Sequence, residues 1–333
     1  MKKILITICL LTLSACGQKS VDEYLSSGKA LVEQKNAKAA IIEFKNAVKV
    51  DPNNAEARFL LGKAYLSEKQ YDFAQKELER ALEFNYKVDV LVPLLSETYQ
   101  KTGADKALLA LTLNNTLNPD DQAKVKFYQL QAHMRLQQVE KANALIDEIR
   151  ALNTESPYKP LSLVISLLLN EKQDAARVQL DNLLQLHPNL PDALKLKARI
   201  LLSEKKLSEA ADVYQTYVNG HPEDLDTSFV LARLYTDTGQ FDKSEPLVDA
   251  LLKVNAEQPV LNQLKSIARM QDKDYANALL FAEKALSVRV EDIPTRLLAG
   301  VSAYFLKDYG TANQHLSLIA SELPASHQGL RIL

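Results

Sequence analysis

The sequence predicts an all-α protein, a superhelical solenoid built from about nine helical hairpins of 34 residues each. Three observations predict this fold class. Alanine recurs every 34 residues, a second row of small residues lies twelve positions earlier, and prolines gather twelve positions later, where each hairpin would end. The composition agrees, because glycine occurs only 9 times in 333 residues and tryptophan is absent, whereas the helix formers alanine and leucine are abundant.

Two rows of small residues define the repeat. Small side chains let the two helices of a hairpin approach closely, so we place the first row in helix A and the second row in helix B of each repeat. Neither row needs a gap. The first row is Gly28, Gly62, Ser96, Leu130, Val164, Ala198, Ala232, Ser266 and Gly300. The second row is Ala40, Ala74, Leu108, Ala142, Ala176, Ala210, Ser244, Ala278 and Ala312.

Proline placement agrees with this frame, because proline cannot continue a helix. Nine of the 12 prolines fall in turns between predicted repeats. Pro93 and Pro160 fall in the first turn of a helix A, where a missing N–H is tolerated, and Pro246 lies inside a helix B, where we expect a kink. The third repeat fits worst, with Thr112 and Asn115 at positions that usually hold a large apolar residue and alanine. We interpret this misfit as sequence drift, with a flexible joint as the alternative.

The rows and their spacing resemble the tetratricopeptide repeat. The matching residues are Gly28, Ala40, Phe44, Ala47 and Pro52 in one unit, and Gly62, Tyr65, Ala74, Leu78 and Ala81 in the next. The resemblance implies a right-handed superhelix in which each hairpin buries its apolar face against the next one, and a role in binding protein or peptide partners. The frame covers residues 21–326 as nine units and one continuous domain, and residues 327–333 start a further helix without a cap.

The N-terminus has the pattern of an export signal. Lys2 and Lys3 precede an uncharged apolar stretch over residues 4–13, which is too short to span a bilayer and suits the core of a signal peptide. The next residues resemble the lipobox of bacterial lipoproteins, and they are Leu13, Ser14, Ala15 and Cys16. An ordinary secretory signal with a chance cysteine is the alternative.

The lipobox resemblance implies that residues 1–15 are removed, that Cys16 carries lipid, and that residues 16–20 form a tether. Cys9, the second cysteine of the chain, would be lost with the signal peptide, so the mature protein would hold no disulfide. Gly17 differs from the Asp that retains many such lipoproteins in the inner membrane. We therefore expect an anchor in the outer membrane, with the protein facing the periplasm.

Nothing in the sequence predicts catalysis, a cofactor or a metal site. The 40 basic and 42 acidic residues nearly balance, which argues against a nucleic-acid partner. The five histidines form no HxxxH pair and adjoin no cysteine, and His187 and His221 are assigned to His-Pro turns. Glycine-rich phosphate loops and the GxSxG nucleophile pattern are absent. We therefore expect a binding protein, not an enzyme.

Helix A carries the candidate binding residues. In the tetratricopeptide family the ligand-facing positions lie beside the first small residue, and here they pair an aromatic ring with a cation at i,i+4 spacing. The candidates for a peptide-binding groove are Phe59, Lys63, Phe127, Arg199, Phe229 and Arg233. This set suits an extended peptide that bears carboxylates. The alternative is that the cations are merely solvated and the phenylalanines pack on the next repeat.

Residues 13–85 resemble one family more closely. Residues 16–17, 22–25, 39–47 and 51–62 are similar to the start of the tetratricopeptide lipoproteins of the PEP-CTERM system. That resemblance implies a membrane-anchored periplasmic scaffold in exosortase-dependent protein sorting or exopolysaccharide production. Two alternatives stay open, namely an outer-membrane assembly or peptidoglycan-linked adaptor, and the non-catalytic arm of a longer protein.

Overall fold

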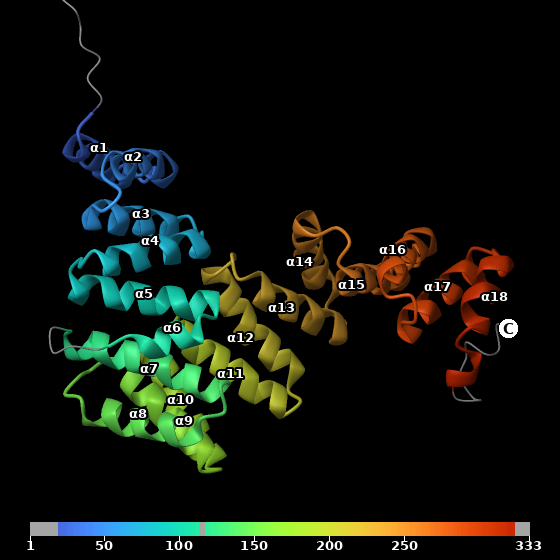
Figure 1. Cartoon of the computed structure of the whole chain (residues 1–333). Coiled ribbons are helices and arrows are strands. Elements are labelled where there is room, and N and C mark those ends of the chain that lie inside the picture. Colours follow the sequence, from blue (N-terminus) through green and yellow to red (C-terminus); the bar gives the residue numbers. More distant parts are fainter. Residues whose placement is uncertain (1–18, 113–116, 324–333) are drawn as a thin grey trace, which may run out of the picture. The chain divides into compact units, whose positions relative to one another are not determined.

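The computed structural model describes residues 19–112 and 117–323. Every regular element in these two ranges is helical, with eighteen α-helices, one 3-10 helix and no strand (Figure 1). The α-helices alternate along the chain as helices A and B of the nine predicted repeats. The predicted all-α class and the repeat count are therefore confirmed.

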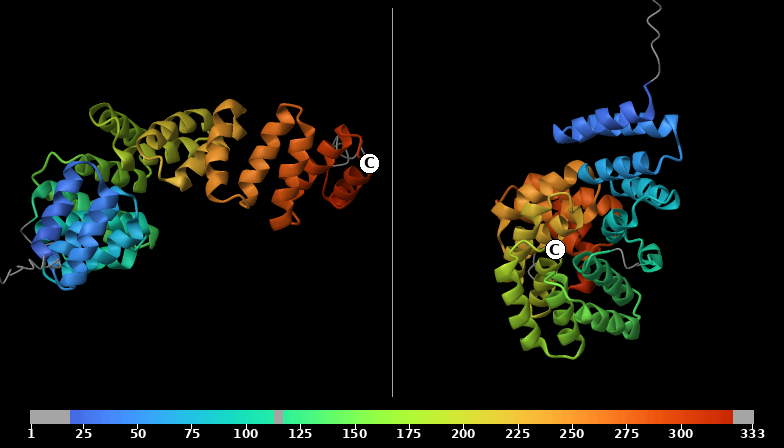
Figure 2. Two further views of the ribbon diagram at one scale, coloured as in Figure 1. Left: turned by 90° about the horizontal axis from the view of Figure 1, so that it is seen from above. Right: turned by 90° about the vertical axis from the view of Figure 1, so that its left-hand side faces the viewer.

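The chain divides into two compact units, Met1–Lys172 and Gln173–Leu333, and the boundary falls between the two helices of the fifth repeat. Within each unit, successive hairpins stack side by side (Figure 2). Unit 1 contains α1 (Val21–Glu33), α2 (Ala37–Val50), α3 (Ala55–Ser67), α4 (Tyr71–Glu83), α5 (Val88–Thr102), α6 (Asp105–Ala110), α7 (Pro119–Arg135), α8 (Val139–Ala151) and α9 (Tyr158–Leu169). Unit 2 contains α10 (Gln173–Leu186), α11 (Pro191–Ser203), α12 (Leu207–Gly220), α13 (Leu225–Asp237), α14 (Phe241–Val254), α15 (Pro259–Gln271), α16 (Tyr275–Val288), α17 (Ile293–Phe305), α18 (Tyr309–Ser317) and the 3-10 helix η1 (Ala320–Glu322).

Every helix A ends in the same way. The second residue after the helix, or the first residue after α5, has a left-handed backbone, and the next N–H then reaches back to a carbonyl of the last turn. Gln70 N–H donates to the Tyr65 carbonyl at 2.9 Å, and Lys206 N–H to the Leu201 carbonyl at 2.9 Å. The left-handed residues are 34 apart, and they are Lys35, Lys69, Gly103, Gln137, Glu171, Lys205, Gly239, Lys273 and Lys307. Only two of the nine are glycine, the residue that adopts this conformation without strain.

The two rows of small residues lie where the sequence predicts them, at the contact between the helices of a hairpin. Every member of both rows is buried. Where the first row holds glycine, a large side chain of helix B fills the space: a Cβ added to Gly28 would lie 2.4 Å from Phe44 Cε1. The close approach of the two helices therefore depends on the absence of that Cβ.

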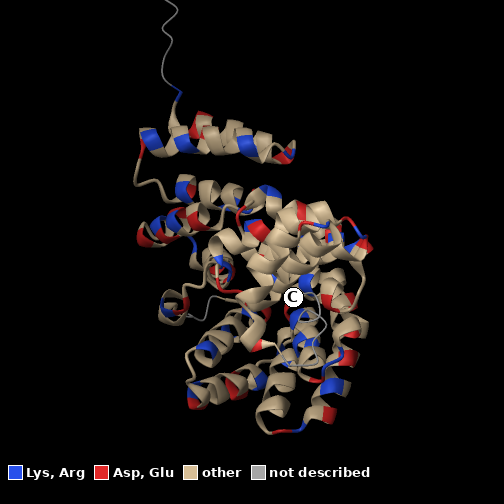
Figure 3. Cartoon of the chain, turned by 90° about the vertical axis from the view of Figure 1, so that its right-hand side faces the viewer, with Lys and Arg blue, Asp and Glu red and all other residues tan. Residues whose placement is uncertain are grey.

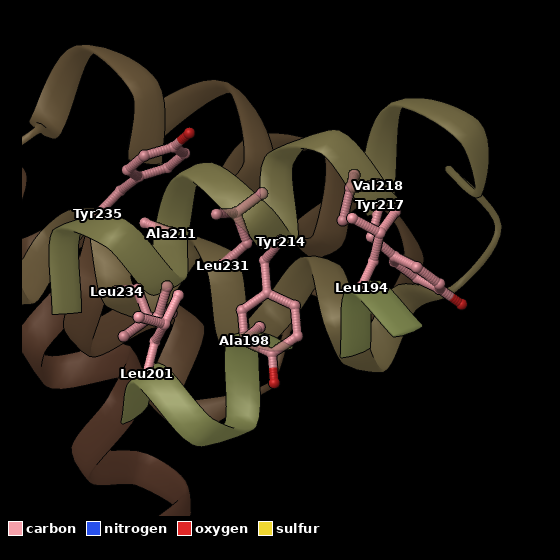
Figure 4. Close-up of a cluster of buried hydrophobic side chains, with 11 residues drawn as sticks. Leu194, Ala198, Leu201, Ala211, Tyr214, Tyr217, Val218, Leu231, Leu234 and Tyr235 are labelled. Atoms are coloured by element: carbon pink, nitrogen blue, oxygen red, sulfur yellow. The ribbon is translucent and has the colours of Figure 1, made fainter. Parts of the chain in front are cut away.

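Neighbouring hairpins share one apolar layer within each unit. In unit 1, Ala57, Leu61 and Ala64 of α3 pack into a cluster with Leu25 and Phe44 of the first hairpin. In unit 2, Tyr214 and Tyr217 of α12 lie among leucines of α11 and α13 (Figure 4). Each hairpin thus completes its core with helix A of the next hairpin, as expected for repeats that contact only their neighbours.

Three of the prolines lie inside helices of the structure, namely Pro93, Pro160 and Pro246. Pro160 does lie in the first turn of α9, but Pro93 is the sixth residue of α5, because that helix already begins at Val88. Placing Pro93 in a first turn was therefore wrong. At Pro246 the helix is not interrupted, since α14 continues from Phe241 to Val254.

The third repeat differs from the others in its helix B. The helix α6 has only six residues and ends at Ala110, after which Leu111 is extended. Gln129 of α7 reaches this end and donates its side-chain N–H groups to the carbonyls of Leu108 and Leu111, both at 3.1 Å. A buried amide of the next repeat thus satisfies carbonyls that a longer helix B would have paired internally.

Candidate binding surface

Phe59 and Phe127, two of the predicted groove residues, are buried. Phe59 is 4% exposed and stacks on Tyr86 with ring centroids 4.3 Å apart. Phe127 is 1% exposed and packs against Tyr158 of the next repeat at 5.2 Å. Assigning these two rings to a ligand surface was wrong, because their side chains lean toward the following hairpin and fill the layer between repeats.

The residue that follows the first small residue of each helix A is charged in several repeats, and in unit 1 two of these charges, those of Lys29 and Glu97, pair with the next repeat. Lys29 Nζ lies 2.7 Å from Glu56 Oε1, and Lys124 Nζ lies 2.7 Å from Glu97 Oε2. In both pairs the partners are 27 residues apart, and the second lies near the start of the next helix A. Charges at these positions thus neutralise each other along the stack.

Lys63 and Arg233 lack this partner. The position 27 residues after each holds a valine, namely Val90 in α5 and Val260 in α15. Lys63 is exposed and has no ion pair among residues 19–112 and 117–323. Arg233 reaches only Asp237 of its own helix at 3.6 Å, and both side chains are largely exposed. Lys63 in unit 1 and Arg233 in unit 2 therefore have no carboxylate from a neighbouring repeat at this position.

Arg199 and Phe229 complete the predicted set in unit 2. Arg199 is exposed on α11, and Asp226 stands at its pairing position without an ion pair to it. Phe229 is half-buried and packs beside Val248 and Leu264. The candidate surface that the structure leaves accessible is therefore Lys63 in unit 1, and Arg199 and Arg233 with the edge of Phe229 in unit 2.

Lys195 occupies in α11 the position that Phe229 occupies in α13, but it belongs to a network of ion-pair and hydrogen-bond contacts. Its Nζ lies 2.6 Å from Asp224 Oδ2 and 4.5 Å from the centroid of the Tyr217 ring, and Tyr217 Oη donates to Asp224 at 2.7 Å. Asp224 also caps α13 by accepting the Thr227 N–H at 3.0 Å. Burial alone would raise the pKa of Asp224, but these hydrogen bonds outweigh it and hold that pKa well below its usual range. This network joins repeats six and seven, so Lys195 is not available to a ligand.

The charge distribution shows no separation by sign. Basic and acidic residues are interspersed on many of the helices (Figure 3). In the two described ranges no group of His, Cys, Asp and Glu side chains is arranged to hold a metal ion. None of the helices in those ranges is long and apolar enough to cross a membrane. The lipobox, Leu13 to Cys16, lies outside the described residues.

Comparison with known proteins identifies the repeat. One family model described as the tetratricopeptide repeat matches residues 31–90 and 201–267. A second model with the same description matches residues 161–224. The chain is a tetratricopeptide-repeat protein. These matches fall in both units, and proteins with such repeats bind protein or peptide partners.

Several solved structures are similar to the chain. The peptide-binding protein YrrB is 17% identical, with 54% of this chain and 92% of that chain covered and a TM-score of 0.42. The type IV pilus biogenesis factor PilW is 16% identical, with coverage of 63% and 96% and a TM-score of 0.43. A repeat protein of Parabacteroides merdae is 17% identical, with coverage of 86% and 99% and a TM-score of 0.37. No curated protein matches the chain.

Proposed function

We propose that this tetratricopeptide-repeat protein is a non-catalytic scaffold that is tethered to a membrane of the bacterial cell envelope and holds protein partners there. The observation that carries the binding part is that Lys63, Arg199 and Arg233, which follow the first small residue of their helices, are not neutralised by a neighbouring repeat. For Lys63 and Arg233 the residue 27 positions ahead is a valine, whereas the equivalent Lys29 pairs there with the carboxylate of Glu56. A partner carboxylate can occupy that place without displacing an ion pair between repeats.

The proposed ligand is an extended peptide segment with acidic side chains. A hydrogen bond between a guanidinium or ammonium group and a carboxylate is charge-assisted, and is about twice as strong as a neutral one. Arg199 and Arg233 belong to neighbouring repeats of unit 2, with Phe229 half-exposed beside them. A peptide that runs across these two repeats would meet two cations and one aromatic edge.

Binding measurements on a partner captured by pull-down from cross-linked cells test this surface. Replacing Lys63 or Arg233 by alanine should weaken binding by about 1–3 kcal/mol, the range for hydrogen bonds to charged groups. Lys29→Ala is the matched control, because Lys29 also follows the first small residue of its helix A but is already paired with Glu56. Equal affinities for wild type, Lys63→Ala, Arg199→Ala and Arg233→Ala would place the binding surface elsewhere.

The tether is proposed from the sequence alone. Cys16 would carry the lipid, and two or three acyl chains hold a protein stably where a single chain does not. Gly17 favours the outer membrane, with the repeats facing the periplasm. Cells that express Cys16→Ser should release the protein from the membrane fraction, and a variant that pellets like wild type would refute the lipobox.

The pathway is proposed from the resemblance to the PEP-CTERM lipoproteins. Protein sorting or exopolysaccharide production would require the scaffold near an export machine, which suits a tethered repeat protein. Deletion of the gene should then reduce surface polysaccharide or the surface display of sorted proteins. A defect confined to outer-membrane assembly or to the cell wall would favour the adaptor alternative.

A further inference from the structure

The residue that follows the first small residue of each helix A stays accessible along the chain. All nine residues at this position lie in the described ranges and none of them is buried, and in α13 and α15 the side chain is accessible although a further repeat follows. Its accessibility is therefore a property of the repeat and does not depend on where the stack of hairpins ends. In unit 2 this position holds two cations and then two apolar residues, and these four, which we call the unit 2 row, are Arg199, Arg233, Ile267 and Val301.

The second half of the unit 2 row has apolar surroundings. Ile267 and Val301 are half-buried, and the residue 27 positions ahead of Ile267 is the exposed Pro294. One turn further along the same helices lie Met270, which is half-buried, and Tyr304, which is 38% exposed. A carboxylate placed here would lose water without gaining a cation, whereas an apolar side chain would be favourably removed from water.

Packing between repeats does not require apolar residues at this position. Lysine or arginine occupies it in four other repeats, which form the same kind of hairpin. The change from cations in α11 and α13 to apolar residues in α15 and α17 therefore alters the chemistry that the row offers to a ligand, while the fold accepts either kind of side chain.

The spacing of the row suits an extended peptide. In unit 2 the helix α13 contacts α15, and α15 contacts α17. Helices in contact lie about 8–10 Å apart. A polyproline II segment has three residues per turn and rises about 3.1 Å per residue, so every third side chain points to the same side at intervals of about 9 Å. One such segment can therefore present one side chain to each successive helix A.

We propose that the ligand of unit 2 is a peptide segment of about ten residues whose side chains at every third position are acidic, acidic, apolar and apolar, in register with the unit 2 row. This ligand rests on the proposed function, because its acidic half is the peptide that Arg199 and Arg233 bind there. Its apolar half lies on the next two helices A, so a single extended chain covers both halves.

Fluorescence anisotropy with purified full-length protein and labelled synthetic peptides of ten residues tests the order of the row. Two matched peptides carry Glu, Glu, Leu and Leu at every third position, one in each chain direction, with serines between. A mixed peptide of the same composition carries Glu, Leu, Glu and Leu. The better of the matched peptides should bind at least about tenfold more tightly, because the mixed order sets a carboxylate against Ile267 or Val301 in either direction.

A charge substitution in the row should change which peptide is preferred. Ile267→Arg gives the row a third cation, which the fold should accept because arginine already occupies this position in α11 and α13. The variant should bind the better matched peptide about tenfold more weakly, and should bind a peptide with Glu, Glu, Glu and Leu about tenfold more tightly than wild type does. Leu280→Arg is the matched control, since it adds the same charge to the same hairpin from α16, where Leu280 is 46% exposed. It should leave the ratio of the two affinities unchanged.

The failures of this ligand and of the proposed function can be told apart. Equal affinities for matched and mixed peptides, both still weakened by Arg199→Ala and Arg233→Ala, would overturn the ordered ligand and leave the acidic-peptide surface standing. So would a shift in preference caused equally by Leu280→Arg. A peptide with four leucines that binds as tightly as the matched peptides would also overturn it, since the cations would then contribute nothing. Failure of every peptide to bind would overturn both.

Discussion

Replacing Gly28 by alanine should destabilise the first hairpin, although alanine is the better helix former. A Cβ at this position would lie 2.4 Å from Phe44 Cε1, 2.7 Å from Cδ1 and 2.8 Å from Cζ. The Phe44 ring is fully buried, so it cannot swing aside. Overpacking of a filled core typically costs about 1–3 kcal/mol, and a clash with three ring atoms belongs at the upper end. The gain in helix propensity is about 1 kcal/mol, which leaves a net loss of about 2 kcal/mol.

Gly220→Ala is the matched control. Gly220 ends α12, and no atom lies within 4 Å of the Cβ that alanine would add. The same substitution should therefore stabilise the protein by about 0.4–1 kcal/mol, because it only reduces the freedom of the unfolded chain. Urea unfolding followed by circular dichroism measures both variants, and the change in midpoint gives the sign directly.

A double-mutant cycle tests the stated cause. The seventh repeat pairs Ala232 with Val248 at the positions that hold Gly28 and Phe44 in the first. Phe44→Val should therefore relieve the clash, so that the double variant is more stable than the two single losses together predict. Coupling between contacting residues is commonly about 0.5–3 kcal/mol. If Gly28→Ala is as stable as Gly220→Ala, or if the cycle shows no coupling, then the close approach is not what the glycine provides.

Three further outcomes are expected. Lys205→Gly should raise the free energy of unfolding by about 1 kcal/mol, measured as a higher urea midpoint, because Lys205 has φ 60° and a left-handed backbone is strained for any residue with a Cβ. A loss of stability would contradict this. Asp224→Asn keeps the helix cap but removes the negative charge that Lys195 and Tyr217 both contact. The free energy of unfolding should fall by about 1–2 kcal/mol, a range lowered by the partial exposure of Lys195. An unchanged urea midpoint would show that the network is not stabilising. Burial and the nearby Arg296 lower the pKa of His315 despite the Glu283 carboxylate at 4.0 Å. The unfolded chain therefore takes up the proton first, so the free energy of unfolding should fall as the pH drops below about 6.5, and His315→Gln should remove that part of the pH dependence. An identical pH profile for the variant would exclude His315 as the cause.

Part of the candidate surface could be predicted from the sequence. The i,i+4 spacing correctly places Lys63 and Arg233 on the exposed side of helix A, because that side is set by the small row next to it. The exposure of Phe59 and Phe127 could not be predicted in the same way. Their position lies at the edge between the open side of the helix and the following hairpin, and only the packed neighbours Tyr86 and Tyr158 decide which side the ring takes.

The spacing of paired charges and the left-handed residues could not be recognised from the sequence alone. Residue 90 is valine, so Lys63 has no carboxylate 27 residues ahead. That absence has meaning only once the structure shows that charges at this position of helix A, such as Lys29 and Glu97, pair with the residue 27 positions ahead. The left-handed residues at the end of each helix A are similar. Glycine at positions 103 and 239 is a visible signal, but lysine at positions 69 and 205 is not, because the hydrogen bonds of the last turn impose the conformation on any residue there.

The sequence by itself determined the helical class, the 34-residue period and the buried rows from Gly28 to Gly300 and from Ala40 to Ala312. These are local properties, since a small residue at a fixed place in each hairpin sets how closely two adjacent helices approach. Only the tertiary structure decided which charges pair between repeats, which aromatic rings are covered, and how the short helix α6 has its carbonyls satisfied by Gln129. Those outcomes depend on side chains from the next hairpin, whose register and distance no single repeat specifies.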